Sequence, residues 1–387
     1  MKQRIFGAAI VALAASSSLA SAQALKIGII ATLSGPQAPL GEQIRDGFQA
    51  GIDSLGGKLG GMAVELTVID DELKPDLAVT KIRGYVESGK VDFVVGPVFS
   101  GIIGPIVKPV MAAGAFLISP NAGPSTLAGK GCSPDLFVTS YQNDQPHSIS
   151  GQFATDQGYK RVFLIAPNYQ AGRDALVGFK SRYKGGEVVA EDYVPLTQMD
   201  MQSEIARIAD AKPDVVYVFL PGGLGINFVK QYRAAGLDKI PVLSTFTVDE
   251  STLPAAGDAA IGFYSGANWA PNMDNAASKA FVTAFEAKYK YVPGSYAAQS
   301  YDTARLIDGA VRAAGGTDHA KLRVALEKAP FESVRGSFKF GVNHYPVQDF
   351  YLARVAKRPD GKLQTEIQKK VLSADVDPYA AECKMGG

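Results

Sequence analysis

The chain has 387 residues, of which 47% are hydrophobic and 20% are charged. This length exceeds one ordinary domain of roughly 100–200 residues, so we expect two lobes, and the average composition argues against both a disordered chain and a membrane-embedded body. The near balance of 39 basic and 38 acidic residues argues against a nucleic-acid partner.

The first 22 residues have the pattern of a secretory signal peptide. Lys2 and Arg4 supply a positive start, residues 5–19 are almost wholly apolar or small, and residues 20–22 (Ala-Ser-Ala) form a small-x-small cleavage signal. The apolar run is shorter than the ~20 residues of a membrane-spanning helix, which disfavours a membrane anchor. A second cleavage signal at residues 22–24 leaves the mature start open by two residues, and we expect the protein to be exported.

From residue 25 the sequence alternates short apolar runs with longer amphipathic stretches. This alternation is typical of strands and crossover helices in a parallel sheet. It predicts strands at residues 25–31, 64–70, 92–96 and 115–119, and helices at residues 41–55, 75–88 and 102–113. These elements make a first doubly wound α/β lobe.

The same pattern restarts near residue 144. It predicts strands at residues 161–166, 187–194, 214–220, 241–244 and 262–266, and helices at residues 172–183, 202–211 and 225–235. Two long amphipathic helices, residues 277–289 and 297–314, are expected to return to the first lobe. Residues 337–340 and 349–356 then alternate apolar and polar side chains around a turn, which indicates a β-hairpin.

We therefore predict an α/β fold of two doubly wound, three-layer lobes joined by a hinge. The first lobe would comprise residues 25–143 and 272–335, and the second lobe residues 144–271 and 336–387. The chain would pass between the lobes near residues 141–144, 268–272 and 335–337.

The chain has two cysteines, Cys132 and Cys383. An even number of cysteines in an exported protein favours a disulfide, so we predict that they pair. Two unpaired thiols stay open as the alternative, because the sequence does not show whether the two residues come within bonding distance.

Motifs for catalysis are absent from the sequence. The nucleophile elbow G-x-S-x-G does not occur. His147, His319 and His344 have no metal-ligand spacing and adjoin no candidate nucleophile, so we expect each on the surface or at a helix cap. Glycine clusters at residues 56–61 and 221–225 complete no nucleotide-binding motif. We predict a protein that is not an enzyme and needs no cofactor and no metal, with a periplasmic hydrolase as a remote alternative.

The loops that leave the strands are the candidates for a ligand site, because ligands of open α/β sheets bind beyond the carboxyl ends of the strands. In the first lobe the loops at residues 32–37, 97–101 and 120–125 are rich in small and hydroxyl residues. Ser100 and Ser119 offer hydroxyl donors, and the N–H groups that begin the following helices favour a carboxylate. The alternative is that the serines only cap helices.

The second lobe contributes the loops at residues 167–170, 221–223 and 245–250, with Tyr169 and Phe246 as aromatic surface. A carboxylate grip that faces an aromatic wall suits a small acid with an apolar or aromatic body. Either aromatic side chain could instead pack inside its own lobe.

Three segments carry a family resemblance. Residues 33–36 (Leu-Ser-Gly-Pro) with 41–43 (Gly-Glu-Gln), residues 94–97 (Val-Val-Gly-Pro) followed by Ser100, and residues 118–122 (Ile-Ser-Pro-Asn-Ala) resemble the periplasmic binding proteins of the branched-chain amino-acid ABC-importer family. The resemblance covers nearly the whole mature chain. It implies a type I periplasmic binding protein: two lobes with three hinge crossings, a cleft that closes on its ligand, a periplasmic location and a monomer. The expected partner is the membrane permease of an ABC importer, and a sensory role with the same cleft is the alternative.

Three departures from the family pattern weaken the case for an amino acid as the ligand. The amino-acid-binding members have a threonine where Gly123 stands, an acidic residue where Phe246 stands and an aromatic residue where Leu40 stands. An ammonium buried without an acceptor is strongly unfavourable, although Asp249 could replace the missing acid.

The sequence also resembles a branch of the family associated with aromatic acids such as benzoate derivatives, at residues 119–125, 166–172 and 219–223. We therefore predict a small aromatic or apolar carboxylic acid as the ligand, with a branched-chain or other amino acid as the alternative. The predicted ligand-binding residues are Leu40, Phe99, Ser100, Ser119, Asn121, Ala122, Gly123, Tyr169, Gly222, Phe246, Thr247 and Asp249.

Overall fold

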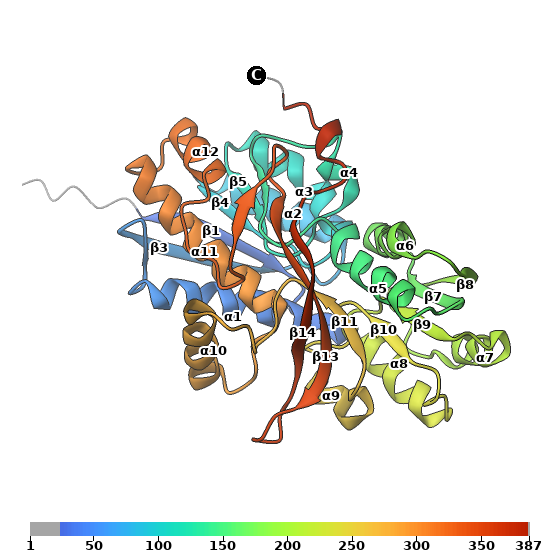
Figure 1. The fold of residues 1–387 in the computed structure, drawn as a ribbon. Helices are drawn as coiled ribbons and strands as arrows, with labels where there is room; N and C mark the ends of the chain where they lie inside the picture. Colours follow the sequence, from blue (N-terminus) through green and yellow to red (C-terminus); the bar gives the residue numbers. More distant parts are fainter. Residues whose placement is uncertain (1–23, 386–387) are drawn as a thin grey trace, which may run out of the picture.

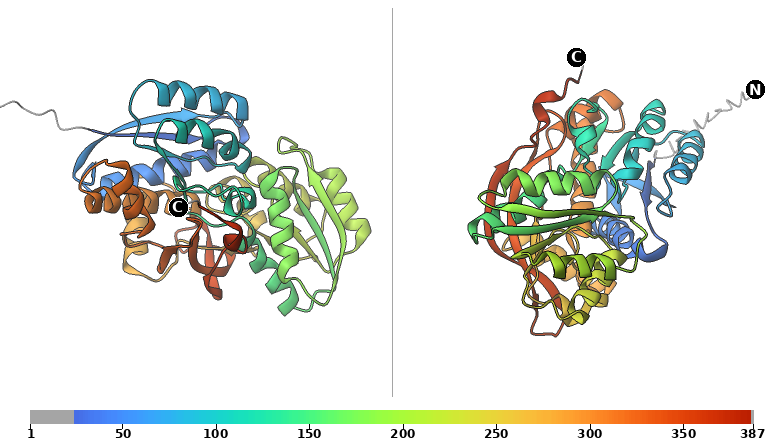
Figure 2. Two further views of the ribbon diagram at one scale, coloured as in Figure 1. Left: turned by 90° about the horizontal axis from the view of Figure 1, so that it is seen from above. Right: turned by 90° about the vertical axis from the view of Figure 1, so that its right-hand side faces the viewer.

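A computed structural model of the chain describes residues 24–385. The signal peptide predicted at residues 1–22 lies outside the described residues. The chain forms two lobes that lie side by side, each built on its own β-sheet (Figures 1 and 2).

The first sheet has six strands in the order β2-β3-β1-β4-β5-β6. They are β1 (Leu25–Ala31), β2 (Lys58–Leu59), β3 (Met62–Asp70), β4 (Phe93–Val95), β5 (Phe116–Ser119) and β6 (Leu136–Val138). All pair in parallel except β2, which is antiparallel to β3. The central strands are continuous apolar runs because helices cover both faces of the sheet.

The helices of the first lobe lie on both faces of this sheet, as the left view of Figure 2 shows. They are α1 (Ala38–Ser54), α2 (Pro75–Glu87), α3 (Ser100–Ala112), α4 (Ser125–Ala128), α10 (Ala276–Tyr289), α11 (Ser295–Ala314) and α12 (His319–Glu327), preceded by the 3₁₀ turn η1 (Gly35–Gln37). α2 packs against α3, and α11 packs along α1. Gly47 permits this close approach, since a Cβ there would lie 2.2 Å from the carbonyl oxygen of Ala297.

The second sheet follows the order β12-β13-β11-β10-β9-β7-β8, and β14 pairs with β13. Its strands are β7 (Arg161–Pro167), β8 (Glu187–Val194), β9 (Val215–Val218), β10 (Val242–Ser244), β11 (Tyr264–Ala267), β12 (Phe338–Phe340), β13 (Pro346–Lys357) and β14 (Leu363–Asp375). β12 and β14 are antiparallel to β13. The long β13–β14 pair runs down the front of the molecule in the view of Figure 1.

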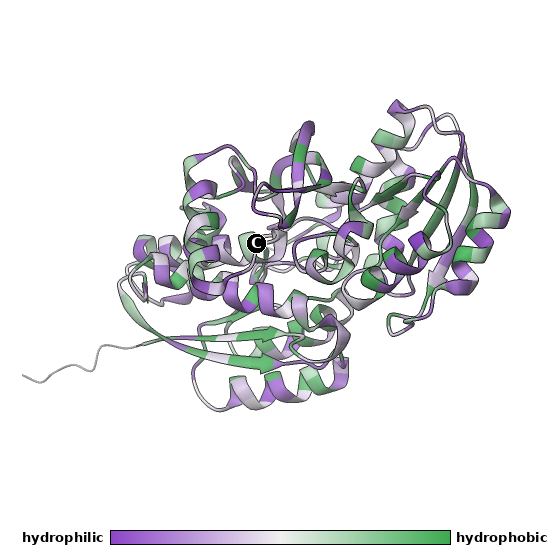
Figure 3. Cartoon of the chain, turned by 90° about the horizontal axis from the view of Figure 1, so that it is seen from below, coloured by the Kyte–Doolittle hydropathy of each residue, from purple (hydrophilic) through white to green (hydrophobic). Residues whose placement is uncertain are grey.

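The helices of the second lobe cover both faces of its sheet (Figure 2, right). They are α5 (Asp144–Asp156), α6 (Gln170–Arg182), α7 (Gln202–Ala211), α8 (Gly223–Ala234) and α9 (Leu253–Ala256), with short 3₁₀ turns η2 (Gly257–Ala260) and, near the C-terminus, η3 (Ala380–Glu382). Apolar residues concentrate along the strands, and the outer helix faces are largely polar (Figure 3).

The observed elements match most of the predicted ones. The strand predicted at 187–194 and the helix predicted at 202–211 have the same bounds in the structure, and the predicted hairpin is the antiparallel pair β12–β13. The elements that the sequence did not indicate include β6, α5, α12 and β14. β14 was missed because most of its side chains are at least partly exposed, so it lacks a clear apolar alternation.

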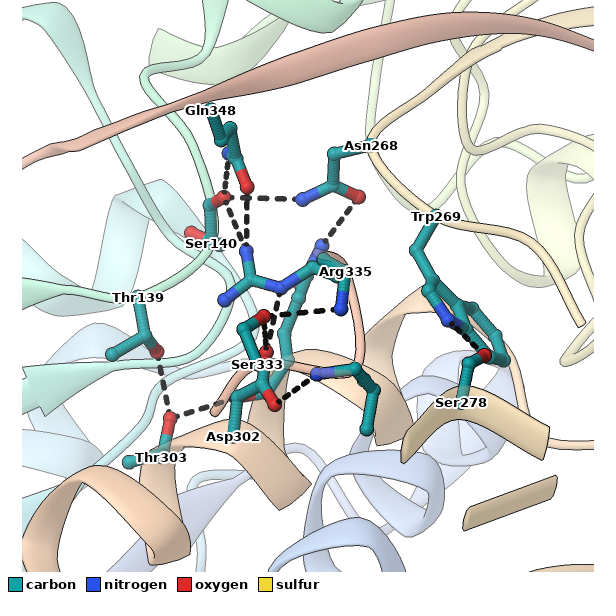
Figure 4. A network of polar contacts seen from close by, with 12 residues as sticks. Thr139, Ser140, Asn268, Trp269, Ser278, Asp302, Thr303, Ser333, Arg335 and Gln348 are labelled. Atoms are coloured by element: carbon teal, nitrogen blue, oxygen red, sulfur yellow. Dashed lines mark hydrogen bonds and ion pairs between the residues drawn. The ribbon is translucent and has the colours of Figure 1, made fainter. Parts of the chain in front are cut away.

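Three segments connect elements of the two sheets: β6 to α5, β11 to α10, and α12 to β12. Ser140, Asn268 and Arg335 lie on these three segments and meet in one buried network (Figure 4). The backbone carbonyl of Ser140 accepts hydrogen bonds from Asn268 Nδ2 at 3.1 Å, from Arg335 Nη1 at 3.1 Å and from Gln348 Nε2 at 2.5 Å. One carbonyl oxygen therefore joins all three connections and strand β13.

The arginine of this hinge network is paired with a buried carboxylate. Arg335 Nε lies 2.9 Å from Asp302 Oδ2 on α11, and Asp302 also accepts hydrogen bonds from Ser333 Oγ at 2.5 Å and from the Val334 N–H at 3.0 Å. Arg335 is 2% exposed and Asp302 is 0% exposed. Because both charges are out of water, removing either one would leave the other buried and unpaired.

Cys132 and Cys383 are joined by a disulfide with a Cα–Cα distance of 5.6 Å. Cys132 follows α4, and Cys383 follows β14 and the turn η3. The bond thus fastens the C-terminal segment, which continues from the second sheet, to a loop of the first lobe.

We predict that Arg335→Met lowers the free energy of unfolding by about 3–5 kcal/mol, because Asp302 loses its buried counter-charge. Urea denaturation followed by circular dichroism measures this loss. Arg161→Met is the matched control, since Arg161 pairs with Glu187 and both side chains are exposed, and such pairs contribute about 0–1 kcal/mol. Equal effects of the two substitutions would contradict a central role for Arg335.

Candidate ligand-binding site

A small cavity lies between the lobes, beyond the carboxyl ends of β4, β5, β7 and β9. Its lining comes from both lobes and from the connecting segments: Val98, Phe99, Ser100, Asn121, Ala122, Tyr141, Asn143, His147, Tyr169, Ala171, Phe219, Pro221 and Tyr296. The cavity volume is about 20 Å³, little more than the ~10–15 Å³ that one water molecule requires. An organic ligand can therefore enter only if the lobes or the lining side chains move apart.

The first lobe presents the start of α3 to the cavity. Ser100 is the first residue of this helix, so its N–H and the next one have no carbonyl partner in the helix and favour an anion. Ser100 Oγ accepts a hydrogen bond from Asn143 Nδ2 at 3.2 Å, which leaves the hydroxyl proton able to donate to a ligand.

Asn121 shapes the neighbouring loop. Its Nδ2 donates to the Val98 carbonyl at 2.6 Å, and its Oδ1 accepts a hydrogen bond from the Tyr141 hydroxyl at 2.8 Å. Both ends of the Asn121 side chain are thus engaged within the protein, and its role is to hold the loop and to orient Tyr141.

Aromatic side chains form the rest of the wall. The rings of Phe99 and Tyr169, from opposite lobes, have centroids 6.1 Å apart, and Tyr169 stacks with Phe219 at 6.4 Å. The His147 imidazole packs edge-on against Phe219 at 4.7 Å. This wall suits a flat apolar body.

Asp174 on α6 links the lobes beside the cavity. Its carboxylate accepts hydrogen bonds from the Ser125 N–H at 3.1 Å, from Ser125 Oγ at 2.7 Å and from Asn143 Nδ2 at 2.9 Å. Since Ser125 begins α4 in the first lobe, these bonds hold the two lobes together across the cleft.

No aspartate, glutamate, lysine or arginine lines the cavity within residues 24–385, and His147 is its one imidazole. Asp249, the candidate partner for an ammonium group, is buried near Tyr141 and Tyr296, whose pKa values are raised by burial and further by its charge. Asp249 Oδ1 accepts hydrogen bonds from the N–H and the hydroxyl of Ser251, and burial raises the pKa of Asp249 to about 6.

Five of the predicted ligand-binding residues line the cavity: Phe99, Ser100, Asn121, Ala122 and Tyr169. Ser119 lies just outside it, where its hydroxyl donates to the Ala122 carbonyl at 2.7 Å and fixes the loop. Gly123 also lies outside, and a Cβ there would come within 1.9 Å of the Tyr141 carbonyl oxygen. Leu40 is fully buried on α1 in the core of the first lobe.

The remaining predicted residues support the lining from behind. Phe246 stacks on Tyr141 at 5.0 Å and has a φ of 55°, which is rare for an aromatic residue. Thr247 Oγ1 bonds the Leu220 N–H at 2.9 Å and the Val218 carbonyl at 3.1 Å. Gly222, with φ 61°, faces Gln37 of the other lobe.

Eight lining residues are missing from the predicted ligand-binding set: Val98, Tyr141, Asn143, His147, Ala171, Phe219, Pro221 and Tyr296. Val98 and Pro221 nevertheless lie in loops that the sequence marked as candidates for the site. Tyr141 and Asn143 fall in a stretch that the sequence marks only as a crossing between lobes. A segment that connects the two lobes must pass through the junction between them. Its residues are therefore candidates for lining a cavity at that junction.

The expectation that the histidines lie at the surface or at helix caps is wrong for His147 and His344. His147 is 1% exposed on α5, and burial lowers its pKa to about 3. His344 is buried and stacks on Phe137 at 4.0 Å. His319 is partly exposed and stacks on Phe116. The misplacement of His147 follows from the missed helix α5, whose first turn lies at the cavity.

Among residues 24–385, no helix is both long and apolar enough to span a membrane. The same residues contain no cluster of His, Cys, Asp or Glu side chains suited to hold a metal ion.

The two α/β lobes with a cavity at the carboxyl ends of both sheets define a solute-binding protein of the type I periplasmic fold. The chain belongs to the periplasmic binding protein family, whose sequence pattern matches residues 24–362. Members of this family are the substrate-binding components of transport systems and are not enzymes. They bind small ligands and act together with ABC permeases. The predicted fold and family are thus confirmed.

Among curated relatives, the chain is 30% identical to the Leu/Ile/Val-binding protein homolog 6 of Brucella melitensis over 89% of this chain and 91% of that protein. Among solved structures, it is 36% identical to an ABC-transporter solute-binding protein from R. palustris in complex with benzoate. That match covers 94% of this chain and 100% of the other, with a TM-score of 0.88. A protein from Rhodopseudomonas palustris BisB5 in complex with 3,4-dihydroxybenzoic acid is 31% identical, covers 92% and 99%, and has a TM-score of 0.86.

Two adjacent buried carboxyl groups make stability depend on pH. Glu250 Oε1 accepts hydrogen bonds from the N–H and the hydroxyl of Thr365, each at 2.7 Å. Burial and the neighbouring Asp249 raise the pKa of Glu250 from 4.5 to about 7. The folded protein therefore binds the proton more tightly than the unfolded chain, and this group's contribution to stability falls as the pH rises from 4.5 to 7.

We predict that Glu250→Gln weakens the loss of stability between pH 4.5 and pH 7, because the amide carries no charge to desolvate. At pH 8 the variant should be more stable than the wild type by about 2 kcal/mol. Urea denaturation across this pH range measures the effect, and Glu65→Gln on the exposed face of β3 is the control. A wild-type slope that Glu250→Gln leaves unchanged would contradict the assignment.

Proposed function

We propose that the chain is the periplasmic solute-binding component of an ABC importer and that it binds a small aromatic monocarboxylate in the cavity between its lobes. The observation that carries the proposal is the uncharged, aromatic lining that meets the start of α3 at Ser100. In support, two similar proteins from R. palustris are described in complex with benzoate and with 3,4-dihydroxybenzoic acid. The signal-peptide pattern of residues 1–22 supports export, and we expect a monomer.

The carboxylate of the ligand would lie at the start of α3, where the first N–H groups and the Ser100 hydroxyl donate to it. Its ring would lie between Phe99, Tyr169 and Phe219. No arginine or lysine is needed, since a carboxylate can be held by several oriented donors. The lobes would open about the Ser140 network to admit the ligand and close on it through contacts such as Asp174 with Ser125, and the permease would recognise the closed form.

A branched-chain amino acid is the second candidate, because curated relatives are named Leu/Ile/Val-binding proteins. Its ammonium group would need an acidic partner. Asp249 is the candidate for that role, but it does not line the cavity and its Oδ1 is engaged with Ser251. An ammonium enclosed by the aromatic wall alone would lose its hydration without a compensating charge.

We predict that the protein without its first 22 residues binds benzoate and 3-phenylpropanoate but not leucine or phenylalanine. 3-Phenylpropanoate and phenylalanine share one carbon skeleton and differ by the α-ammonium, so the pair isolates the cost of burying that charge. Thermal shift detects binding, since a ligand at 100 times its Kd adds ~2.7 kcal/mol of stability. Binding of the amino acids alone would overturn the aromatic-acid proposal and favour the second candidate.

We further predict that Ser100→Ala weakens the binding of benzoate by about 10- to 100-fold, because a hydrogen bond to a charged group contributes about 1.5–3 kcal/mol. Isothermal titration calorimetry measures the change. Ser88→Ala, at the exposed end of α2, is the control and should leave the affinity unaltered. An unchanged affinity in Ser100→Ala would place the carboxylate elsewhere.

A further inference from the structure

His147 is the one imidazole that lines the cavity among residues 24–385. It lies on the first turn of α5 and is 1% exposed. Its Nδ1 is hydrogen-bonded to the hydroxyl of Tyr217 on β9. Within the described residues no protein group bonds its other nitrogen, Nε2, so the imidazole offers the cavity one unengaged polar atom.

This imidazole is a neutral group. Its surroundings are apolar: the ring packs against Phe219 at 4.7 Å and Phe246 at 6.2 Å, and burial lowers its pKa to about 3. A neutral imidazole does not offer a carboxylate the positive charge that histidinium would. The start of α3 at Ser100 is the better carboxylate site, since several donors and the helix dipole meet there.

The partner that suits Nε2 is a hydroxyl. Tyr217 can donate to Nδ1 or accept from it, so Nε2 is a donor in one tautomer and an acceptor in the other. A hydroxyl group can both donate and accept, and therefore matches either tautomer, whereas an unsubstituted ring edge would leave Nε2 buried without a partner. Leaving such a polar atom unsatisfied is unfavourable.

We propose that His147 is a specificity-determining residue whose Nε2 hydrogen-bonds a hydroxyl on the ring of the ligand, so that the preferred ligand is a hydroxylated aromatic monocarboxylate. This inference rests on the proposed function, because it presupposes that an aromatic acid occupies the cavity. It adds the substituent that the site selects and the atom that selects it.

Two tyrosines compete for the same role. Tyr169 and Tyr296 line the cavity and carry hydroxyl groups of their own. Unlike Nε2, a tyrosine hydroxyl can rotate its proton, and it tolerates an apolar neighbour by turning away. Their contribution is separated from that of His147 by substitution.

The test compares each of the three hydroxybenzoates with the methylbenzoate that carries a methyl group at the same ring position. The methyl group fills nearly the volume of the hydroxyl but forms no hydrogen bond, so the affinity ratio reports the polar contact alone. Isothermal titration calorimetry gives the ratios for the wild type and for His147→Asn, His147→Gln and Tyr296→Phe. An asparagine amide reaches the position of Nδ1 and keeps the Tyr217 contact, whereas a glutamine amide reaches the position of Nε2.

The wild type should bind at least one hydroxybenzoate about 10-fold or more tightly than its methyl counterpart. His147→Asn should reduce this ratio to about 1, and His147→Gln and Tyr296→Phe should retain most of it. The circular dichroism melting curve of His147→Asn serves as the check that the variant folds.

A wild-type ratio near 1 for all three positions, or a ratio that persists in His147→Asn and disappears in Tyr296→Phe, would overturn the role of His147 while leaving the aromatic-acid function intact. If neither benzoate nor any substituted benzoate binds the wild type, the proposed function fails, and the inference about His147 fails with it.

Discussion

The carbonyl oxygen of Ser140 is the point on which the arrangement of the two lobes depends. Asn268, Arg335 and Gln348 all donate to it, and the buried Arg335–Asp302 pair secures the arginine from the side of α11. Three chain segments that connect the two sheets are thereby held at one place, out of water. Rotation about this place can change the distance between the lobe surfaces at the cleft while the network itself stays intact, which is the geometry of a hinge.

The polarity and shape of the cavity are set by the residues that lie around this hinge. The connection between β6 and α5 contributes Tyr141 and Asn143 to the cleft. The first lobe contributes the start of α3 and Tyr296 of α11, and the second lobe contributes Tyr169 and Phe219. The nearby carboxylate of Asp174 is engaged with protein donors, whereas Asp249 is engaged through Oδ1 only and its buried Oδ2 has no hydrogen-bond partner among the described residues. The site therefore combines hydrogen-bond donors for an anion with an aromatic wall. The carboxylate that an ammonium group would require as a partner lies outside the lining of the cavity.

Much of this could be predicted from the sequence, because a parallel α/β sheet makes a strong local pattern. The apolar strands 25–31 and 161–166 and the helices predicted at 41–55, 75–88 and 102–113 follow directly from periodicity, and so do the loops that carry Ser100, Asn121 and Tyr169. The rest depends on non-local contacts. No local pattern shows that α5 begins at the cavity and buries His147, that Phe246 lies behind Tyr141, or that Asp249 turns towards Ser251. Leu40 lies outside the lining of the cavity for the same reason, since its burial in the first lobe follows from packing of α1.

A crystal structure of the protein with benzoate tests the central claim most directly. We expect the carboxylate at the start of α3, within hydrogen-bonding distance of Ser100 Oγ, and the ring between Phe99, Tyr169 and Phe219, with the Ser140 network unchanged. A carboxylate that instead contacts His147, or benzoate bound outside the cleft, would contradict the account.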